Sequence, residues 1–266
     1  MVSLLVATAL AAAAPADAAP GTQTAEPAMF VVRDADTTIY IFGTFHALDG
    51  QARWFSPPVR TALGQSQELV LETVIPEQPQ LRAELSRFKG PSVTPSASFL
   101  GTTRMAINAG QARGMQVNNG ADMILRREAE AEGKQVEGLE TLEFQLNMFN
   151  RMPAAEAPAI PAPGPARSAS PAPMEGLSQA MGEMQAAWKR GDQTVFVRML
   201  GQLKAGSPDT YRMMFTERNA RWADWIRARM QTPGTVFVAV GAGHLAGNDS
   251  LLVQLAQRGI PSQRVY

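Results

Sequence analysis

Residues 38–46 read Thr-Ile-Tyr-Ile-Phe-Gly-Thr-Phe-His, and residues 235–244 read Thr-Val-Phe-Val-Ala-Val-Gly-Ala-Gly-His. Each stretch is a run of β-branched and aromatic residues, which predicts a buried strand, and each ends in Gly-x-x-His. The chain has two histidines in all, His46 and His244, so both stand three positions after a glycine. With 22 glycines in 266 residues, chance gives this coincidence in about 0.7% of cases. We therefore expect two neighbouring strands whose ends bring both histidines to one site.

The composition is that of a globular protein with a substantial core. Hydrophobic residues make up 45% of the chain and charged residues 18%. Lysine plus arginine equals aspartate plus glutamate, at 24 each, so the net charge gives no reason to expect nucleic acid or anionic lipid as a partner. The absence of cysteine excludes disulfides, thiolate metal ligands and a cysteine nucleophile.

The first 18 residues are apolar and rich in alanine, and they end in Ala16-Asp17-Ala18. This pattern predicts a secretory signal peptide cleaved near Ala18, and hence a periplasmic or secreted protein. No lysine or arginine precedes Arg33, which is atypical for such a signal, and a disordered Ala/Pro tail is the alternative. A stable membrane span is not expected because alanine is too weakly apolar. Residues 19–28 are expected to be a tether.

The rest of the chain, residues 29–266, alternates predicted strands with predicted helices, which is typical of an α/β domain. Asp34-Ala35-Asp36-Thr37 separates two strand-like runs and predicts a hairpin. We expect a single domain with a mixed central β-sheet flanked by helices and a helical middle section. The expected strands are residues 29–33, 38–42, 68–72, 134–141, 235–240 and 262–266. The expected helices are one that begins at Ser56-Pro57-Pro58 with Val59, Ala62 and Leu63 on one face, then 77–89, 96–113, 122–132 with Asp122 as its cap, one that reaches about Phe149, a helical section 175–230, and 250–258, capped by Asn248-Asp249-Ser250.

Residues 153–173 differ from the rest, since seven prolines lie there among alanines and serines. Such a segment cannot bury enough apolar surface to fold, and we interpret it as a flexible linker or a disordered surface insertion within the one domain.

Four of the predicted strands end near an ionisable residue: His46, Glu72, Glu140 and His244. In α/β sheets, functional groups gather where strands end at their carboxyl edge. Two imidazoles and a carboxylate could form an open site for Zn²⁺, Mn²⁺ or Fe²⁺, which would lower the pKa of bound water. We expect the glycine before each histidine to allow a tight turn and to leave room for a ligand.

Other interpretations of the same residues remain open. Without any metal, a histidine held by Glu72 could act as a general base on water, with a second histidine or Arg218 stabilising the oxyanion. Glu140 could cap a helix N-terminus, and Trp222 with its neighbours could be plain core. The sequence has no Gly-x-Ser-x-Gly elbow, no Gly-x-Gly-x-x-Gly and no Walker motif, which disfavours an α/β-hydrolase triad and a nucleotide site.

Taken together, these stretches resemble the TraB/GumN family, relatives of the animal Tiki proteins. The resemblance rests on Ile41–His46, Leu69–Glu72, Gly133–Thr141 with Gln145, Glu217-Arg218-Asn219, and Val238–Gly247. It covers residues 29–266 with matching order and spacing. The resemblance implies an α/β domain in the superfamily of erythromycin esterases and ChaN-like haem-binding proteins.

The resemblance further implies a metal-dependent, peptidase-like hydrolase built on two Gly-x-x-His motifs and a glutamate. In this chain His46, His244 and Glu72 would bind a divalent ion (Zn, Mn, Co or Fe) and, with Arg218, act on a peptide or small-molecule substrate. The residues expected to shape the site are Gly43, Thr44, Gly241, Gly243, Glu140 and Asn219. The alternatives are a non-catalytic binding protein for haem or another small ligand, and a metal-free esterase-like hydrolase.

Overall fold

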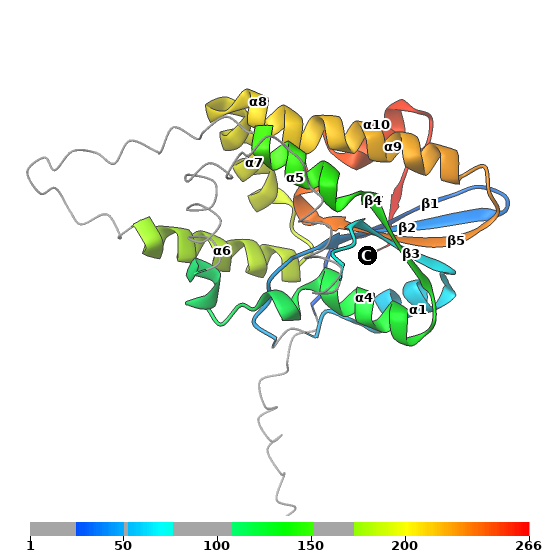
Figure 1. Cartoon of the computed structure of the whole chain (residues 1–266), viewed down its shortest axis with the longest axis horizontal. Helices are drawn as coiled ribbons and strands as arrows, with labels where there is room; N and C mark the ends of the chain where they lie inside the picture. Colours follow the sequence, from blue (N-terminus) through cyan, green and yellow to red (C-terminus); the bar gives the residue numbers. More distant parts are fainter. Residues whose placement is uncertain (1–24, 51–52, 77–107, 152–172, 266) are drawn as a thin grey trace, which may run out of the picture.

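Six strands form one mixed sheet in the order β4-β3-β5-β2-β1-β6 (Figure 1). The computed structural model describes residues 25–50, 53–76, 108–151 and 173–265. The strands are β1 Met29–Arg33, β2 Thr37–Thr44, β3 Glu68–Thr73, β4 Gln135–Glu140, β5 Gly234–Gly241 and β6 Gln263–Arg264. β2, β5, β3 and β4 run parallel, whereas β1 is antiparallel to both β2 and β6. The sheet, with helices on both faces, confirms the predicted α/β class.

β2 and β5 come from opposite ends of the chain and lie side by side in parallel. Their pairing runs in register from Thr37 opposite Gly234 to Thr44 opposite Gly241, so both strands end at the same level. β3 pairs with the other side of β5, and β4 with β3. The four strands predicted to end near an ionisable residue therefore finish along one edge of the sheet.

Helices cover both faces of the sheet (Figure 1). α1 (Pro57–Gln65) and α4 (Ala121–Ala131) lie on one face, and α9 (Glu217–Arg229) and α10 (Leu251–Gln257) on the other. The other described helices are α5 (Leu142–Arg151), α6 (Pro173–Lys189), α7 (Thr194–Gly206) and α8 (Pro208–Tyr211). Three short turns complete them: the 3₁₀ turns η1 (Val117–Asn119) and η3 (Ala242–Leu245), and the π-helical turn η2 (Arg212–Thr216).

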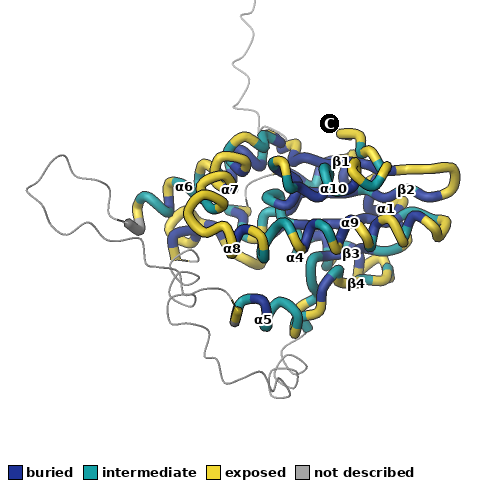
Figure 2. Tube along the Cα trace, turned by 90° about the horizontal axis from the view of Figure 1, so that it is seen from above, coloured by how far each residue is buried: buried dark blue, intermediate teal, exposed yellow. Residues whose placement is uncertain are grey.

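The core consists of two layers because neighbouring residues of a strand point to opposite faces of the sheet. In β5, Phe237 packs on the side of α1 and α4, whereas Val236 and Val238 pack against α9 and α10. All three are fully buried. Figure 2 shows the sheet as the buried centre of the chain, with exposed residues concentrated on the outer helices.

Several local predictions are confirmed. The Asp34 carboxylate closes the β1–β2 turn by accepting hydrogen bonds from Asp36 N (3.2 Å) and Thr37 N (2.8 Å). Ser250 Oγ accepts from Val253 N at 3.3 Å and caps α10. The α1 residues predicted to share one face are the ones that it buries: Val59, Ala62 and Leu63.

One prediction is wrong: Asp122 does not cap α4. The helix begins at Ala121 after Gly120, and Asp122 lies in its first turn with its carboxylate near His46. A β-like backbone at Gly120 (φ −54°, ψ 145°) takes the cap position, because residues 117–121 pack closely against the chain that follows β2.

Some predictions lie outside the described residues. These are the signal peptide at 1–18, the helix at 77–89, most of the helix at 96–113, and the insertion at 153–173 except for Pro173, which begins α6. Within the described ranges, no helix is both long and apolar enough to cross a membrane.

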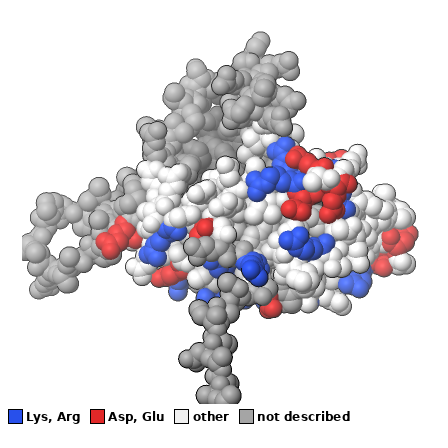
Figure 3. Space-filling model, turned by 90° about the horizontal axis from the view of Figure 1, so that it is seen from below, with Lys and Arg blue, Asp and Glu red and all other residues white. Residues whose placement is uncertain are grey.

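Charges of both signs lie together on the surface. Figure 3 shows lysine and arginine beside aspartate and glutamate on the face turned to the viewer. Among the ion pairs of this chain, Arg126 Nε lies 2.7 Å from Glu130 Oε1 within α4, and Lys134 Nζ lies 3.2 Å from Glu132 Oε2 just after it.

The close approach of α4 to the end of β2 gives a stability prediction. A Cβ on Gly120 would overlap the carbonyl oxygen of His46, whereas a Cβ on Gly64, within α1, meets nothing within 4 Å. We expect Gly120→Ala to lower the free energy of unfolding by about 1–3 kcal/mol, since backbone must move. Gly64→Ala, the matched control, should raise it by about 0.5–1 kcal/mol. Urea unfolding measures both, and a Gly120→Ala variant as stable as the unmodified chain would contradict the described packing.

Candidate functional site

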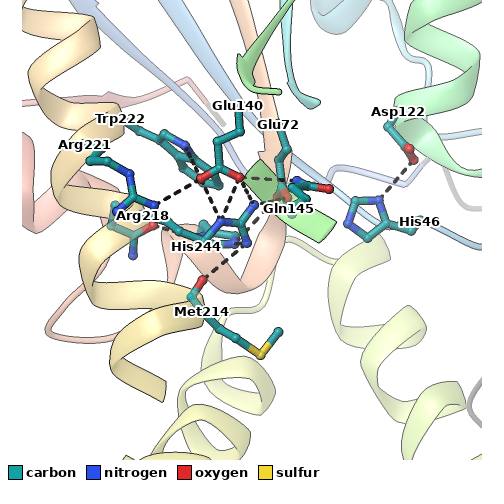
Figure 4. Close-up of polar contacts among 12 residues, drawn as sticks. His46, Glu72, Asp122, Glu140, Gln145, Met214, Arg218, Arg221, Trp222 and His244 are labelled. Atoms are coloured by element: carbon teal, nitrogen blue, oxygen red, sulfur yellow. Dashed lines mark hydrogen bonds and ion pairs between the residues drawn. The ribbon is translucent and has the colours of Figure 1, made fainter. Parts of the chain in front are cut away.

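The carboxyl edge of the sheet carries the candidate site. His46 follows β2, Glu72 is the fifth residue of β3, Glu140 ends β4 and His244 lies in η3 directly after β5. Figure 4 shows these four residues close together, with Arg218 from the first turn of α9 beside Glu72, Glu140 and His244. These residues are far apart in sequence. They lie together because β2, β5, β3 and β4 run parallel, so that their carboxyl ends are at the same edge of the sheet.

The centre of the site is the space beside Gly241. A Cβ built on Gly241 would lie 3.1 Å from Glu72 Oε1, 3.4 Å from His46 Nε2 and 3.7 Å from His244 Cδ2. Side chains from three strand ends thus meet closely beside Gly241, which has no side chain of its own.

This glycine provides room and does not make an unusual turn. Its φ of −52° and ψ of 135° are accessible to any residue, and Gly43 does not have a positive φ either. The expectation that both motif glycines allow a tight turn is therefore wrong, while the expectation of room for a ligand stays a prediction. A Cβ at Gly43 would press against Ala242 and Leu245, at 3.3 Å from each, so Gly43 instead allows η3 to pack on β2.

The Glu72 carboxylate is held as an anion. Its Oε1 accepts a hydrogen bond from Gly241 N at 2.6 Å, and its Oε2 accepts from Arg218 Nη2 at 2.9 Å. Burial by itself raises the pKa of Glu72, but the basic groups of His244, Arg218 and His46, with the Gly241 N–H, lower it to about 2. Glu72 is therefore ionised throughout the neutral range.

His46 lies at the mouth of the site next to Asp122. Its Nδ1 is 3.4 Å from Asp122 Oδ1, a buried oxygen that has no hydrogen-bond partner in the described part of the chain. Desolvation lowers the pKa of His46, whereas the Asp122 and Glu72 carboxylates raise it, to about 9 overall. The His46 side chain is 60% exposed, so water moderates these charges. The ion pair turns Nε2 of His46 toward Gly241 and Glu72.

His244 is buried and neutral. Its ring packs between Trp222 (ring centres 4.4 Å apart) and Phe215 (4.9 Å). Desolvation lowers the pKa of His244 to about 3, with Arg218 and His46 acting in the same direction and Glu72 against them. At neutral pH, His46 is therefore positively charged and His244 is uncharged.

Arg218 connects the inner part of the site. Its Nε donates to both Glu140 oxygens at 3.0 Å, and its Nη2 donates to Glu140 Oε2 at 2.8 Å. Glu140 also accepts from Trp222 Nε1 at 3.1 Å and from Gln145 Nε2 at 3.3 Å. Arg221 Nη2 lies 3.5 Å from Glu140 Oε1. Glu140 therefore lies in a fully hydrogen-bonded position and fixes Arg218.

The remaining predicted residues lie around this centre. Asn219 is buried and contacts His244, and Gly243 allows Phe215 to pack within 3.3 Å of where a Cβ would stand. Thr44 is buried at the end of β2, and its hydroxyl has no hydrogen-bond partner among the described residues. All the predicted site residues therefore lie at or beside this edge of the sheet.

The donor atoms only partly fit the metal ion that the resemblance implies. Imidazole nitrogens and a carboxylate oxygen are suitable ligands, and an oxygen beside each Nδ1 is the usual support for a ligating histidine. His46 Nε2 and Glu72 Oε1 face the space at Gly241, but His244 turns Nε2 to Arg218 Nη1 at 3.2 Å. Within the described ranges, no group of three histidine, aspartate or glutamate residues is arranged to hold a metal. In this arrangement, the residues do not form a complete metal site.

Sequence reasoning missed three contributors. Asp122 was interpreted as a helix cap, Trp222 as core alone, and Phe215 was not singled out. Trp222 is indeed buried, but its indole N–H also bonds Glu140 and its ring packs on His244. No local pattern distinguishes these residues, because their partners lie on other elements: His46 is 76 positions from Asp122, and His244 is 29 positions from Phe215 and 22 from Trp222.

The charged state of His46 and the neutral state of His244 can be measured directly, because the chain has no third histidine. In metal-free protein, NMR titration should show one imidazole with a pKa near 9 and one that stays neutral between pH 5 and 8. Asp122→Asn should lower the higher pKa toward the usual value of about 6.5, since it removes the nearest anion. Asp224→Asn, which removes an exposed carboxylate paired with Arg258, should leave it unchanged. Two histidines that both titrate near 6.5 would contradict the site geometry.

The comparisons with known proteins identify the family of this chain. The TraB/PrgY/gumN family profile matches residues 28–95 and 92–264, which together include every residue of the site. No curated protein and no solved structure matches the chain. A match of this extent shows that the chain belongs to the TraB/PrgY/gumN family.

Proposed function

We propose that this protein is a hydrolase whose reaction centre is the space beside Gly241. The observation that carries the proposal is the convergence of His46 Nε2 and Glu72 Oε1 on that space, at 3.4 and 3.1 Å from the absent Cβ. A site of this kind can hold a water molecule or a polarised carbonyl oxygen between an imidazole and a carboxylate. The pKa values of these two groups are shifted in opposite directions, which is typical of acid–base sites.

The residues of the chain have distinct roles in this proposal. His46, charged and exposed at the mouth, is placed to orient the substrate and to donate a proton from Nε2. Glu72 remains a carboxylate and accepts a hydrogen bond from water or from the substrate. Arg218 and His244 form the buried wall behind Glu72, and Arg218 Nη2 keeps its Oε2 hydrogen-bonded.

In the metal-dependent form of the proposal, a divalent ion, Zn²⁺, Mn²⁺, Co²⁺ or Fe²⁺, would be held by His46, Glu72 and His244, and a neutral His46 would then be a ligand instead of a proton donor. When bound, such an ion lowers the pKa of water and polarises a carbonyl oxygen. The proposed substrate bond is a peptide bond, and the proposed location is the periplasm or the exterior of the cell. These finer assignments come from the family resemblance, and the geometry at Gly241 supports the hydrolase class.

The first experiment measures hydrolysis by the chain purified without a histidine tag. A peptide library and a set of chromogenic esters should be offered after chelator treatment and again with each ion added back. We expect peptide cleavage that rises on ion addition and that falls at least ~100-fold in His46→Ala, since a lost catalytic group or ligand costs this much or more. Circular dichroism should show unchanged folding.

Each alternative outcome has a clear meaning. Ester cleavage that continues after chelator treatment would show that the protein is a metal-free hydrolase. A shift in haem absorption that His46→Ala abolishes, with no cleavage of any substrate, would show that the protein binds a ligand and is not a hydrolase. Full activity in both His46→Ala and His244→Ala would contradict the site.

A second prediction concerns Gly241 itself. Gly241→Ala places a methyl group in the space between Glu72 Oε1 and His46 Nε2, while its backbone dihedrals suit alanine. We expect a loss of activity of ~100-fold, because the methyl group displaces Glu72 Oε1, and a decrease in unfolding free energy of about 1–3 kcal/mol, because the buried carboxylate must shift to admit the methyl group. Gly64→Ala is again the control. Unaltered kcat/KM in Gly241→Ala would show that the reaction takes place elsewhere.

A further inference from the structure

The two histidines present different edges of their rings to the space beside Gly241. His46 turns a nitrogen to it, since Nε2 lies 3.4 Å from where a Cβ on Gly241 would stand. The nearest atom of His244 is a carbon, Cδ2, at 3.7 Å. A C–H edge neither gives nor takes a proton, so any contribution of His244 must come from its two nitrogens.

Both nitrogens of His244 are already engaged by neighbouring side chains. Asn219 Nδ2 donates to the carbonyl oxygen of Asp249 at 2.8 Å, which orients the amide and places its Oδ1 at 2.7 Å from His244 Nδ1. An amide oxygen can only accept, so Nδ1 carries the hydrogen of the neutral ring and Nε2 has the lone pair. Arg218 Nη1 lies 3.2 Å from Nε2 and donates to it.

The guanidinium of Arg218 in turn holds Glu72. Its Nη2 donates to Glu72 Oε2 at 2.9 Å, while Nε and Nη2 also bind Glu140. Nη1, at the remaining corner, has His244 Nε2 and the Met214 carbonyl oxygen (3.3 Å) as acceptors. Because the guanidinium is planar and rigid, the acceptor at Nη1 helps to set the direction in which Nη2 meets Glu72.

His244 does not bind Glu72 itself. Its Nε2 is 3.7 Å from Glu72 Oε1, which is too far for a hydrogen bond, and with the ring hydrogen on Nδ1 neither atom has a hydrogen to donate. The residue is 5% exposed, and its ring packs between Trp222 and Phe215, whose ring centres lie 4.4 and 4.9 Å away. The influence of His244 on the carboxylate therefore passes through Arg218.

We propose that His244 is a positioning residue: its Nε2 lone pair holds Arg218, which in turn holds the Glu72 carboxylate for reaction. The imidazole is a hydrogen-bond acceptor of fixed direction, and it neither gives nor takes a proton during turnover. The proposal rests on the proposed function in one respect, that Glu72 is a reacting group. It assigns the two Gly-x-x-His motifs different tasks, one at the reacting atoms and one behind them.

The test replaces the ring by two amide side chains that differ in reach. The side-chain oxygen of glutamine is three bonds from Cβ, as Nε2 is in histidine, so His244→Gln can still accept from Arg218. That of asparagine is two bonds from Cβ, as Nδ1 is, so His244→Asn does not reach the guanidinium. Both variants lose the ring and its packing, which makes each the matched control for the other.

Steady-state kinetics of the full chain, with the best substrate from the hydrolysis assays, give the first readout. We expect His244→Gln to keep kcat within ~3-fold of the unmodified chain and His244→Asn to lower it at least ~30-fold, with KM changed less than ~3-fold in both. In Arg218→Lys, which lacks the planar fork, the two substitutions should differ by less than ~3-fold, since the path to Glu72 is already lost.

The second readout needs no substrate. ¹⁵N NMR of the unmodified chain near neutral pH should show one ring with a hydrogen on Nδ1 and none on Nε2, and the signals that disappear in His244→Gln identify this ring as His244. The Nη1 hydrogens of Arg218 should exchange with solvent at similar rates in the unmodified chain and in His244→Gln, and at least ~10-fold faster in His244→Asn.

Three results would overturn the proposal. Equal kcat values in the two folded variants would do so, because a shared loss means that the imidazole itself takes part as an acid, a base or a ligand, and no loss means that His244 contributes nothing to turnover. A hydrogen on Nε2, or equal exchange of the Arg218 hydrogens in all three proteins, would show that His244 does not hold the guanidinium. If the unmodified chain cleaves no substrate, the proposed function fails, and the NMR readouts alone decide whether His244 positions Arg218.

Discussion

The parallel pairing of β2 with β5 is the constraint on which the rest of the structure depends. The two strands are separated by almost the whole domain in sequence, yet they pair in register over their full length and end level with each other. This pairing places the chain after β2, which carries His46, beside η3, which carries His244. It also leaves β5 in the centre, flanked by β2 and β3, so that Glu72 enters the same space from the other side. A shift of two residues in this register would separate the motifs by more than 6 Å along the strands.

Behind that space, the fold keeps a group of charges almost completely out of water. Arg218, Glu140 and His244 are 4%, 8% and 5% exposed. A buried guanidinium is tolerated only when its charge is balanced and its donors are satisfied, and Arg218 has two carboxylates and five acceptors. Such a network is costly to disturb in part, which explains why the sequence supplies aromatic rings, an amide and a backbone carbonyl around it.

The two Gly-x-x-His motifs look equivalent in sequence but differ in surroundings. His46 lies at the exposed mouth with an aspartate, which favours its charged form, whereas His244 lies inside between two aromatic rings with an arginine, which favours its neutral form. The same residue type therefore serves two electrostatic roles in one site, set by environment alone.

Much of this protein could be predicted from sequence, because the deciding signals are local. Alternating strand and helix patterns gave the α/β class, apolar spacing gave the buried face of α1, and the paired Gly-x-x-His motifs pointed to His46, His244 and the strand ends that carry Glu72 and Glu140. The partners of these residues could not be predicted, since Asp122, Asn219 and Trp222 act through contacts between separate elements. The sequence by itself determined which groups stand at the ends of the strands. Only the tertiary structure decided that Arg218 binds the lone pair of His244 and that Gly241 leaves room rather than making a turn, because hydrogen-bond direction and free space depend on how packed elements face one another.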